Sequence, residues 1–213
     1  MADNFLEKRY DEVFGRSSSP TGPSVKKPTL DKLLLKNRSY RAFDKNYKVH
    51  QLQLDAIIGV NTRIASGANA QTLRFRLVNG GEKAAGMLPL IHLGGALPEL
   101  HLPFPGTEPE TFIVVCSTKQ ENPIIDIDLG ISLQSMLLKA VELGLGGIII
   151  RNFDKGSVKG LLGLSLTPLA VLAIGKPAEA VQLVPVRAGD DLKYYRDNGT
   201  HFVPKIVAED LII

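Results

Sequence analysis

Tryptophan is absent from this 213-residue chain, aromatic residues make up 6% of it, and cysteine occurs once, as Cys116. A single cysteine excludes a framework of disulfides, and so few aromatic rings leave little material for stacking nucleic-acid bases. The net charge of +3 is also too small to indicate a nucleic-acid partner. The first residues lack the apolar segment of a secretion signal, and no apolar run approaches the ~18 residues of a membrane span. We therefore expect a cytoplasmic protein with neither membrane nor nucleic acid as a partner.

Motifs that mark common catalytic and nucleotide-binding sites are missing as well. The chain has no GxGxxG, GxxxxGK[ST] or GxSxG pattern, which excludes the dinucleotide fingerprint, the P-loop and the hydrolase elbow. None of the four histidines has a histidine or cysteine partner at metal-ligand spacing, so no metal site is predicted. Cys116 lies in an apolar stretch, where burial raises the pKa of a thiol, and we interpret it as a core residue.

The composition indicates a folded chain, with 44% hydrophobic and 22% charged residues. Its length corresponds to about one domain with an extension. Serine, proline and glycine dominate residues 16–24, after a stretch at 4–13 that predicts a short helix. We therefore divide the chain into an N-terminal helix and Ser/Pro/Gly-rich linker, 1–25, and a compact domain, 26–213.

The pattern of apolar residues predicts alternating strands and helices, which indicates an α+β or an α/β protein with four or five core strands. The most strongly predicted helix covers 128–143, with Asp126 or Asp128 as its N-cap and glycines at its end. Residues 86–110 are rich in proline and glycine and are expected to be irregular. Long loops of this kind are often functional or form a lid. The other predictions are helices at 29–37, 52–64 and 158–164, strands at 74–78, 111–116 and 167–175, a short element at 147–150 and an edge segment at 182–186.

A basic stretch near the start of the compact domain holds the first candidate site. Residues 26–48 contain eight Lys or Arg and two Asp, a local net charge of +6. Within them, Arg38, Ser39 and Arg41 place two guanidinium groups and a hydroxyl within four residues. A guanidinium fork matches phosphate oxygens, and serine adds a short neutral donor. The pattern fits a phosphate or anion site, and also the basic end of an ordinary helix.

A second candidate patch lies at residues 66–71, where polar side chains alternate with small residues. Ser66, Asn69 and Gln71 belong to it. The amides offer both a donor and an acceptor, which suits a pyrimidine-like ring edge, and the small neighbours let a flat ring approach the backbone. A helix cap followed by a turn would use the same residue types. Near the C-terminus Lys205 follows a proline, and this lone cation indicates nothing by itself.

Taken in order, these segments resemble a known family. NRSYRAF (37–43), SGANAQTLRF (66–75), DLGISLQSMLLKAVELGLGG (128–147) and LAIGKP (172–177) look like the FMN-dependent nitroreductase family, with a similarity that extends over residues 28–213. The resemblance implies an α+β fold with a mostly antiparallel four- to five-stranded sheet wrapped by helices. It also implies an intertwined homodimer with one FMN at each end of the interface, touched by both subunits.

The resemblance also implies a role for individual residues. Arg38, Ser39 and Arg41 match the patch that holds the FMN phosphate and ribityl chain, and Lys205 matches the cation that completes it. Ser66, Asn69 and Gln71 match the patch that reaches the flavin from the partner subunit. The segment beside the flavin N5 edge corresponds to Arg151 and Asn152. The chain departs from the family pattern at Asn37, at Thr72 and Leu73, and at Ile206, where the family has Arg, Pro-Trp and often a second basic residue.

Arg151 is unusual in this position, because the family often has Glu-Gly there. A cation beside the flavin ring would favour the anionic hydroquinone and raise the reduction potential. It would alternatively pair with an acidic substrate, or point to solvent.

The function implied by the resemblance is that of an FMN-dependent oxidoreductase. It would take hydride from NAD(P)H and reduce a small electrophilic acceptor, of the nitroaromatic, quinone or enone class, by a ping-pong mechanism. No catalytic side chain is assigned, because the flavin performs the redox chemistry. The alternative is an FMN-binding carrier or redox sensor without turnover. A nucleic-acid-binding module built on residues 26–48 is disfavoured by the modest net charge.

Overall fold

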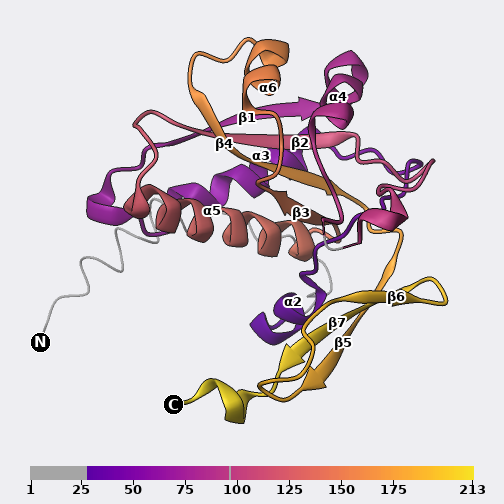
Figure 1. The fold of residues 1–213 in the computed structure, drawn as a ribbon. Helices are drawn as coiled ribbons and strands as arrows, with labels where there is room; N and C mark the ends of the chain where they lie inside the picture. The colour runs from indigo at the N-terminus through magenta and orange to yellow at the C-terminus, as the bar shows by residue number, and fades with distance from the viewer. Residues whose placement is uncertain (1–27, 96) are drawn as a thin grey trace, which may run out of the picture.

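The fold is α+β, with a central four-stranded sheet in the order β1-β2-β4-β3 whose neighbours are all antiparallel (Figure 1). The computed structural model describes residues 28–95 and 97–213, so the predicted helix at 4–13 and linker at 16–24 lie outside the described residues. The predicted class and the mostly antiparallel sheet are confirmed. The strands are β1 (Leu73–Asn79), β2 (Thr111–Ser117), β3 (Gly146–Ile150) and β4 (Thr167–Gly175).

Helices cover both faces of this sheet. On β2, Ile113 and Val115 point to one face, and Phe112 and Val114 to the other, since side chains alternate along a strand. The first face packs against α3 (Gln51–Gly59) and the long α5 (Pro123–Glu142), and the second against α4 (Gly81–Met87) and α6 (Lys155–Leu162) (Figure 1). Burial on both faces explains why β2 and β4 read as uninterrupted apolar runs.

The long helix begins earlier than predicted. Asn122, rather than Asp126 or Asp128, is the N-cap of α5: its side chain accepts the backbone N–H groups of Ile124 and Ile125, and Pro123 occupies the first helical turn. Asp128 instead lies buried within the helix, where its Oδ1 accepts the N–H of Gly67 at 2.7 Å. An asparagine followed by proline was the stronger start signal.

Residues 81–110 contain more structure than predicted. The seven-residue α4 was missed, because two glycines with positive φ, Gly80 and Gly81, precede or open it and obscure its pattern. Two short 3₁₀ helices interrupt the following stretch, η3 (Leu88–Leu90) and η4 (Pro98–Leu100). The other strands and helices predicted within the described residues are present. Cys116 is buried in β2, and burial raises the pKa of its thiol, as expected for a core residue.

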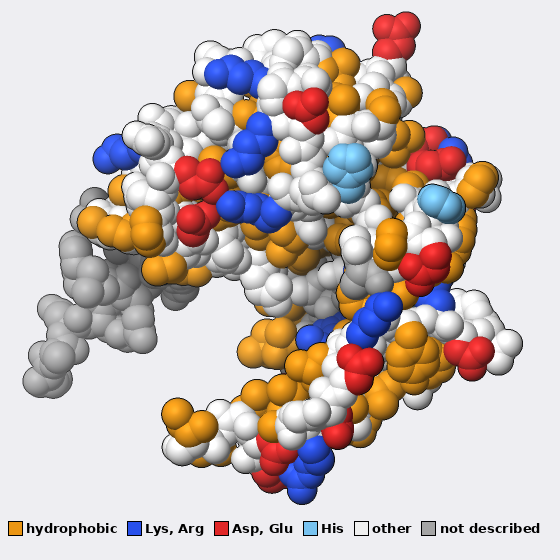
Figure 2. All heavy atoms as spheres, in the orientation of Figure 1, with side chains coloured by type: hydrophobic (Ala, Val, Ile, Leu, Met, Phe, Trp, Pro, Cys, Tyr) orange, Lys and Arg blue, Asp and Glu red, His pale blue; other side chains and the backbone are white. Residues whose placement is uncertain are grey.

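The C-terminal part forms a second sheet of three strands, in the order β5-β7-β6, that lies beside α2 (Leu30–Lys36) and apart from the main body (Figure 1). The predicted edge segment is indeed an edge, and it pairs in parallel with the central strand β7. Figure 2 shows a hollow between this sheet and the body. The strands are β5 (Ala180–Val186), β6 (Tyr195–Asp197) and β7 (Thr200–Ile206), followed by the 3₁₀ helix η5 (Ala208–Leu211).

The segment 37–43 connects the two sheets. Ser39 forms a parallel bridge to Gly147 of β3, and Phe43 forms an antiparallel bridge to Pro177, just before β5. A Cβ on Gly147 would lie 2.5 Å from the carbonyl oxygen of Ala173, so a side chain there would push β3 off its neighbour. A Cβ on Gly146 would lie 2.5 Å from Cδ2 of Tyr40, so the absence of a side chain at this glycine lets the basic segment dock against the sheet.

Among the described residues, no helix has the length and apolar character needed to cross a membrane.

Candidate functional site

A cavity of about 300 Å³ lies where the basic segment meets the C-terminal sheet. Among the described residues, three cations and no acidic residue line it. Arg38, Ser39 and Arg41, predicted from one patch, therefore meet Lys205, which is more than 160 residues away in sequence. The other lining residues are Leu34 of α2 and its C-cap Asn37, Gln134 of α5, and Val181, Tyr194, His201 and Val203 of the C-terminal part.

Arg41 is the most enclosed of these cations, with 7% of its surface exposed. Its Nη1 lies 3.0 Å from the carbonyl oxygen of Ser39 and 3.2 Å from Nε2 of His201. The guanidinium carbon lies 4.8 Å from the ring centre of Tyr194, a cation–π distance. Burial lowers the pKa of Arg41, although a guanidinium stays charged. Its Nε is buried without a hydrogen-bond partner among the described residues.

Arg38 lies at the end of α2 and is partly buried. Its Nη2 donates to the carbonyl oxygen of Leu34, one of the free carbonyls at a helix C-terminus. Burial lowers its pKa, and its Nε also has no hydrogen-bond partner in the described chain. Both arginines therefore keep a donor edge unused, which is the arrangement expected of residues that await an anion.

The carboxylate that contacts Arg41 binds its backbone and not its guanidinium. Glu179, with 3% of its side chain exposed, accepts the backbone N–H groups of Arg41 and Ala42 and forms an ion pair with Arg196. Its carboxylate forms no hydrogen bond or ion pair with the guanidinium of Arg41. The charge of Arg41 is therefore left for the cavity, while its backbone is fixed by Glu179. Sequence reasoning missed Glu179, Tyr194 and His201, because each contacts Arg41 from over a hundred positions away and no local motif marks such residues. It also missed Arg196, whose part in the site depends on its ion pair with Glu179.

The second predicted patch lies at a different cavity, of about 540 Å³. Ser66 and Gln71 line it together with residues of α3, β1 and α5, and Asn69 accepts a hydrogen bond from Nε2 of Gln71 at 3.0 Å. Ser132 lines this cavity and Gln134 lines the first one, so the two cavities face different sides of α5. A single chain therefore does not bring the two patches together.

The backbone of this second patch is strained. Ala68, Asn69 and Gln71 have φ values of 49°, 52° and 46°, in the left-handed region that residues with a side chain rarely adopt. Asp128 of α5 holds the loop through the N–H of Gly67. Such strain is typical of segments whose exact shape is used for binding.

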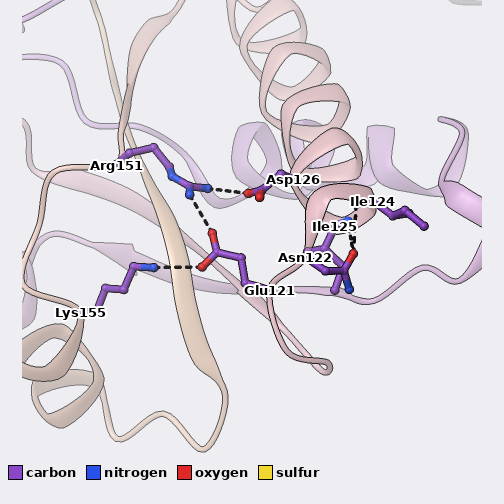
Figure 3. A network of polar contacts seen from close by, with 7 residues as sticks. All are labelled: Glu121, Asn122, Ile124, Ile125, Asp126, Arg151 and Lys155. Atoms are coloured by element: carbon purple, nitrogen blue, oxygen red, sulfur yellow. Dashed lines mark hydrogen bonds and ion pairs between the residues drawn. The ribbon is translucent and has the colours of Figure 1, made fainter.

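Arg151 and Asn152 line neither of these cavities. Arg151 forms ion pairs with Oε1 of Glu121 at 2.7 Å and with Oδ1 of Asp126 at 3.3 Å, and Lys155 joins Glu121 at 3.2 Å (Figure 3). The two residues directly follow β3, about 13 Å along the strand from the bridge at Gly147. The guanidinium is half-exposed and its charge is balanced by carboxylates.

Fold and site together define an α+β protein with a cationic, acid-free cavity beside an antiparallel sheet. The family model named "Nitroreductase family" matches residues 34–176, more than half of the chain. The chain belongs to the nitroreductase family. The match ends before β5, so Lys205 and the other cavity residues of the C-terminal sheet lie outside it.

Solved structures similar to this chain agree with that assignment at the level of the fold. A nitroreductase family protein from Clostridium difficile 630 shares 22% identity over 71% of this chain and 86% of its own, with a TM-score of 0.57. The FMN- and NADPH-dependent nitroreductase NfnB from a Sphingopyxis species shares 19% over 71% and 89%, with a TM-score of 0.59. An Exiguobacterium sibiricum protein, crystallised with FMN, shares 18% over 73% and 92%, with a TM-score of 0.59. No curated protein matches this chain.

The burial of His201 makes the stability of the protein dependent on pH. Burial, followed by the charges of Arg41 and Arg196, lowers the pKa of His201 from 6.5 to about 4. Between these two values the unfolded chain binds a proton that the folded chain does not, so the free energy of unfolding falls as the pH falls, by at most about 1.4 kcal/mol per pH unit. Urea unfolding at pH 7, 6 and 5 measures this decrease in the free energy of unfolding.

His201→Gln is the matched control, because it lacks the titrating group and keeps the other three histidines. We expect the wild-type protein to lose more stability than the variant over this range. Parallel losses in both proteins would contradict the assignment of a buried, neutral imidazole.

Proposed function

We propose that this protein is an FMN-dependent oxidoreductase that takes hydride from NAD(P)H and reduces a small electrophilic acceptor of the nitroaromatic, quinone or enone class. The observation that carries the proposal is the acid-free cavity with three cations in a chain of the nitroreductase family. Arg38, Ser39, Arg41 and Lys205 would hold the phosphate of FMN. Residues 26–213 would form the FMN-binding domain.

The residues of the cavity fit one end of FMN. A phosphate that is close to a dianion suits three cations and the unused Nε groups of Arg38 and Arg41. A volume of about 300 Å³ lies at the lower limit of small-molecule sites. It has room for the phosphate and the adjoining chain, and the ring would extend beyond it towards the end of β3. Arg151 and Asn152 would lie beside that ring.

When bound, FMN would supply the hydride chemistry, and the side chains described here would bind and orient it. Arg41 and Lys205 would neutralise the phosphate, and Ser39 would donate its hydroxyl. No side chain of the cavity is needed as an acid or base for the transfer of hydride. A ping-pong sequence follows if donor and acceptor use the same open face of the ring in turn.

The ring needs a second wall, and we propose that a second copy of the chain provides it. Ser66 and Gln71 line the other cavity of their own chain, and with Asn69 they would contact the flavin of the partner. The exposed face of α5 carries Ile124, Ile127 and Ile131, with exposed fractions of 60%, 63% and 36%. An apolar stripe at this spacing is typical of a subunit interface. The proposed assembly is an intertwined homodimer.

Flavin binding and reduction test the function directly. The purified protein, supplied with FMN, should show flavin absorption that bleaches when NADH or NADPH is added without oxygen, and should turn over with nitroaromatic or quinone acceptors. Replacing Lys205 or Arg38 by Ala should weaken FMN binding about tenfold or more, because each removes a charged hydrogen bond to phosphate. The affinity for riboflavin, which lacks the phosphate, is the control and should change little.

Two outcomes would redirect the proposal. Bound flavin that nicotinamides fail to reduce would favour the alternative, an FMN-binding carrier or redox sensor. A protein that binds neither FMN nor riboflavin would contradict the proposed cofactor.

Mixing two defective variants tests the shared site. Arg38→Ala/Lys205→Ala removes the phosphate wall, and Asn69→Ala/Gln71→Ala removes the ring wall. In a random mixture about half of the dimers contain one of each chain, and each such dimer has one intact site, so about a quarter of all sites should bind FMN tightly. Binding that stays as weak as in the separate variants would mean that each chain builds its site alone.

Arg151 offers a test of how the ring environment is set. If its guanidinium acts on the flavin, Arg151→Ala should lower the midpoint potential of bound FMN, by on the order of tens of millivolts. Glu121→Gln is the matched variant: it frees Arg151 from its closest carboxylate and should raise the potential. Potentials that are unchanged in both variants would leave acidic-substrate binding or a purely structural ion-pair network as the role of Arg151.

A further inference from the structure

Three of the groups that hold Arg41 come from the C-terminal part of the chain, which the family match does not reach. Glu179, Tyr194 and His201 all lie beyond residue 176, where the match ends. Glu179 fixes the backbone of Arg41, and the ring of Tyr194 lies against its guanidinium. His201, of which only 1% is exposed, contacts Nη1 of Arg41 through Nε2 at 3.2 Å.

The chemistry of this contact determines the protonation of His201. A guanidinium can only donate hydrogen bonds, so Nε2 must be the acceptor and carry no proton. The imidazole is then neutral, with its proton on Nδ1. In the described structure Nδ1 is buried without a hydrogen-bond partner, an arrangement that costs about 1–3 kcal/mol. Because the N–H at Nδ1 has no partner, the hydrogen bond that Nε2 accepts from Arg41 is the interaction that fixes the imidazole.

We propose that His201 is a positioning residue of the anion cavity: as an Nδ1-protonated neutral imidazole, it accepts a hydrogen bond from Arg41 and keeps this guanidinium in place for a phosphate group. With the carbonyl of Ser39, it engages Nη1 from a second direction. The edge of His201 also packs against Tyr194, with ring centres 5.0 Å apart. The proposal deepens the proposed function, because the phosphate would be that of FMN, but it also applies to a free phosphate.

Variants of His201 separate positioning from packing. His201→Phe keeps an aromatic ring against Tyr194 and removes the acceptor, whereas His201→Gln keeps an amide acceptor. We expect His201→Phe to weaken the binding of inorganic phosphate, measured by calorimetry, and the preference for FMN over riboflavin, each about tenfold. His201→Gln should restore both to within about threefold of wild type.

Phe202→Ala is the structural control. Phe202 stacks on Tyr195, with ring centres 5.1 Å apart, so its loss should lower the melting temperature without changing the preference for FMN over riboflavin. Wild-type binding of His201→Phe, or an equal loss in Phe202→Ala, would overturn the proposal. Phosphate binding by a wild type that fails to bind FMN would leave His201 in this role and refute the proposed cofactor. A wild type that binds neither would refute both.

The protonation of His201 can also be measured on the wild-type protein, so that this test does not depend on the folding of a variant. Nitrogen-15 NMR of the histidine rings at pH 7 should show one neutral ring with the proton on Nδ1 rather than on Nε2. A His201 that is protonated on Nε2, or on both nitrogens, would contradict the hydrogen bond from Arg41 and overturn the proposal.

Discussion

The buried carboxylate of Glu179 is the interaction on which the cationic cavity depends. It accepts the N–H groups of Arg41 and Ala42 and pairs with Arg196, and so ties the basic segment to the C-terminal sheet. Breaking such a buried pair by removing one partner typically costs 3–5 kcal/mol, because the other charge is left uncompensated. The position of this one acid decides two things: where the segment lies, and that the guanidinium of Arg41 is not neutralised from within.

The electrostatic consequence is a cavity prepared for an anion. Arg38, Arg41 and Lys205 repel one another across a small volume, and no acid among the described residues lines it, so a phosphate would relieve the repulsion. His201 has to stay neutral in these surroundings, since a further positive charge would oppose both Arg41 and Arg196. The positive charge that the fold leaves unbalanced would therefore contribute to the binding energy of an anionic ligand.

Most of the secondary structure followed from local signals. The apolar, β-branched runs at β2 and β4 and the broad apolar face of α5 were recognised because burial requires those residue types. The start of α5 was placed too late, because its cap and proline lie before the apolar face begins. The short α4 was missed, since a seven-residue helix next to glycines is stabilised by packing on the sheet more than by its own propensity.

The amino-acid sequence by itself determined the strands of the main sheet, the edge strand β5, the main helices and the two patches of ligand-binding residue types, because period, caps and side-chain chemistry are properties of neighbouring residues. It did not predict β6 and β7, which complete the C-terminal sheet. Only the tertiary structure decided that Lys205 joins Arg38 and Arg41, that Ser66 and Gln71 line another cavity, and that Arg151 is paired with Glu121. It also revealed His201 and Glu179. These contacts join positions that lie from 30 to more than 160 residues apart, and the order of strands and the docking of the C-terminal sheet bring them together, which no local pattern encodes.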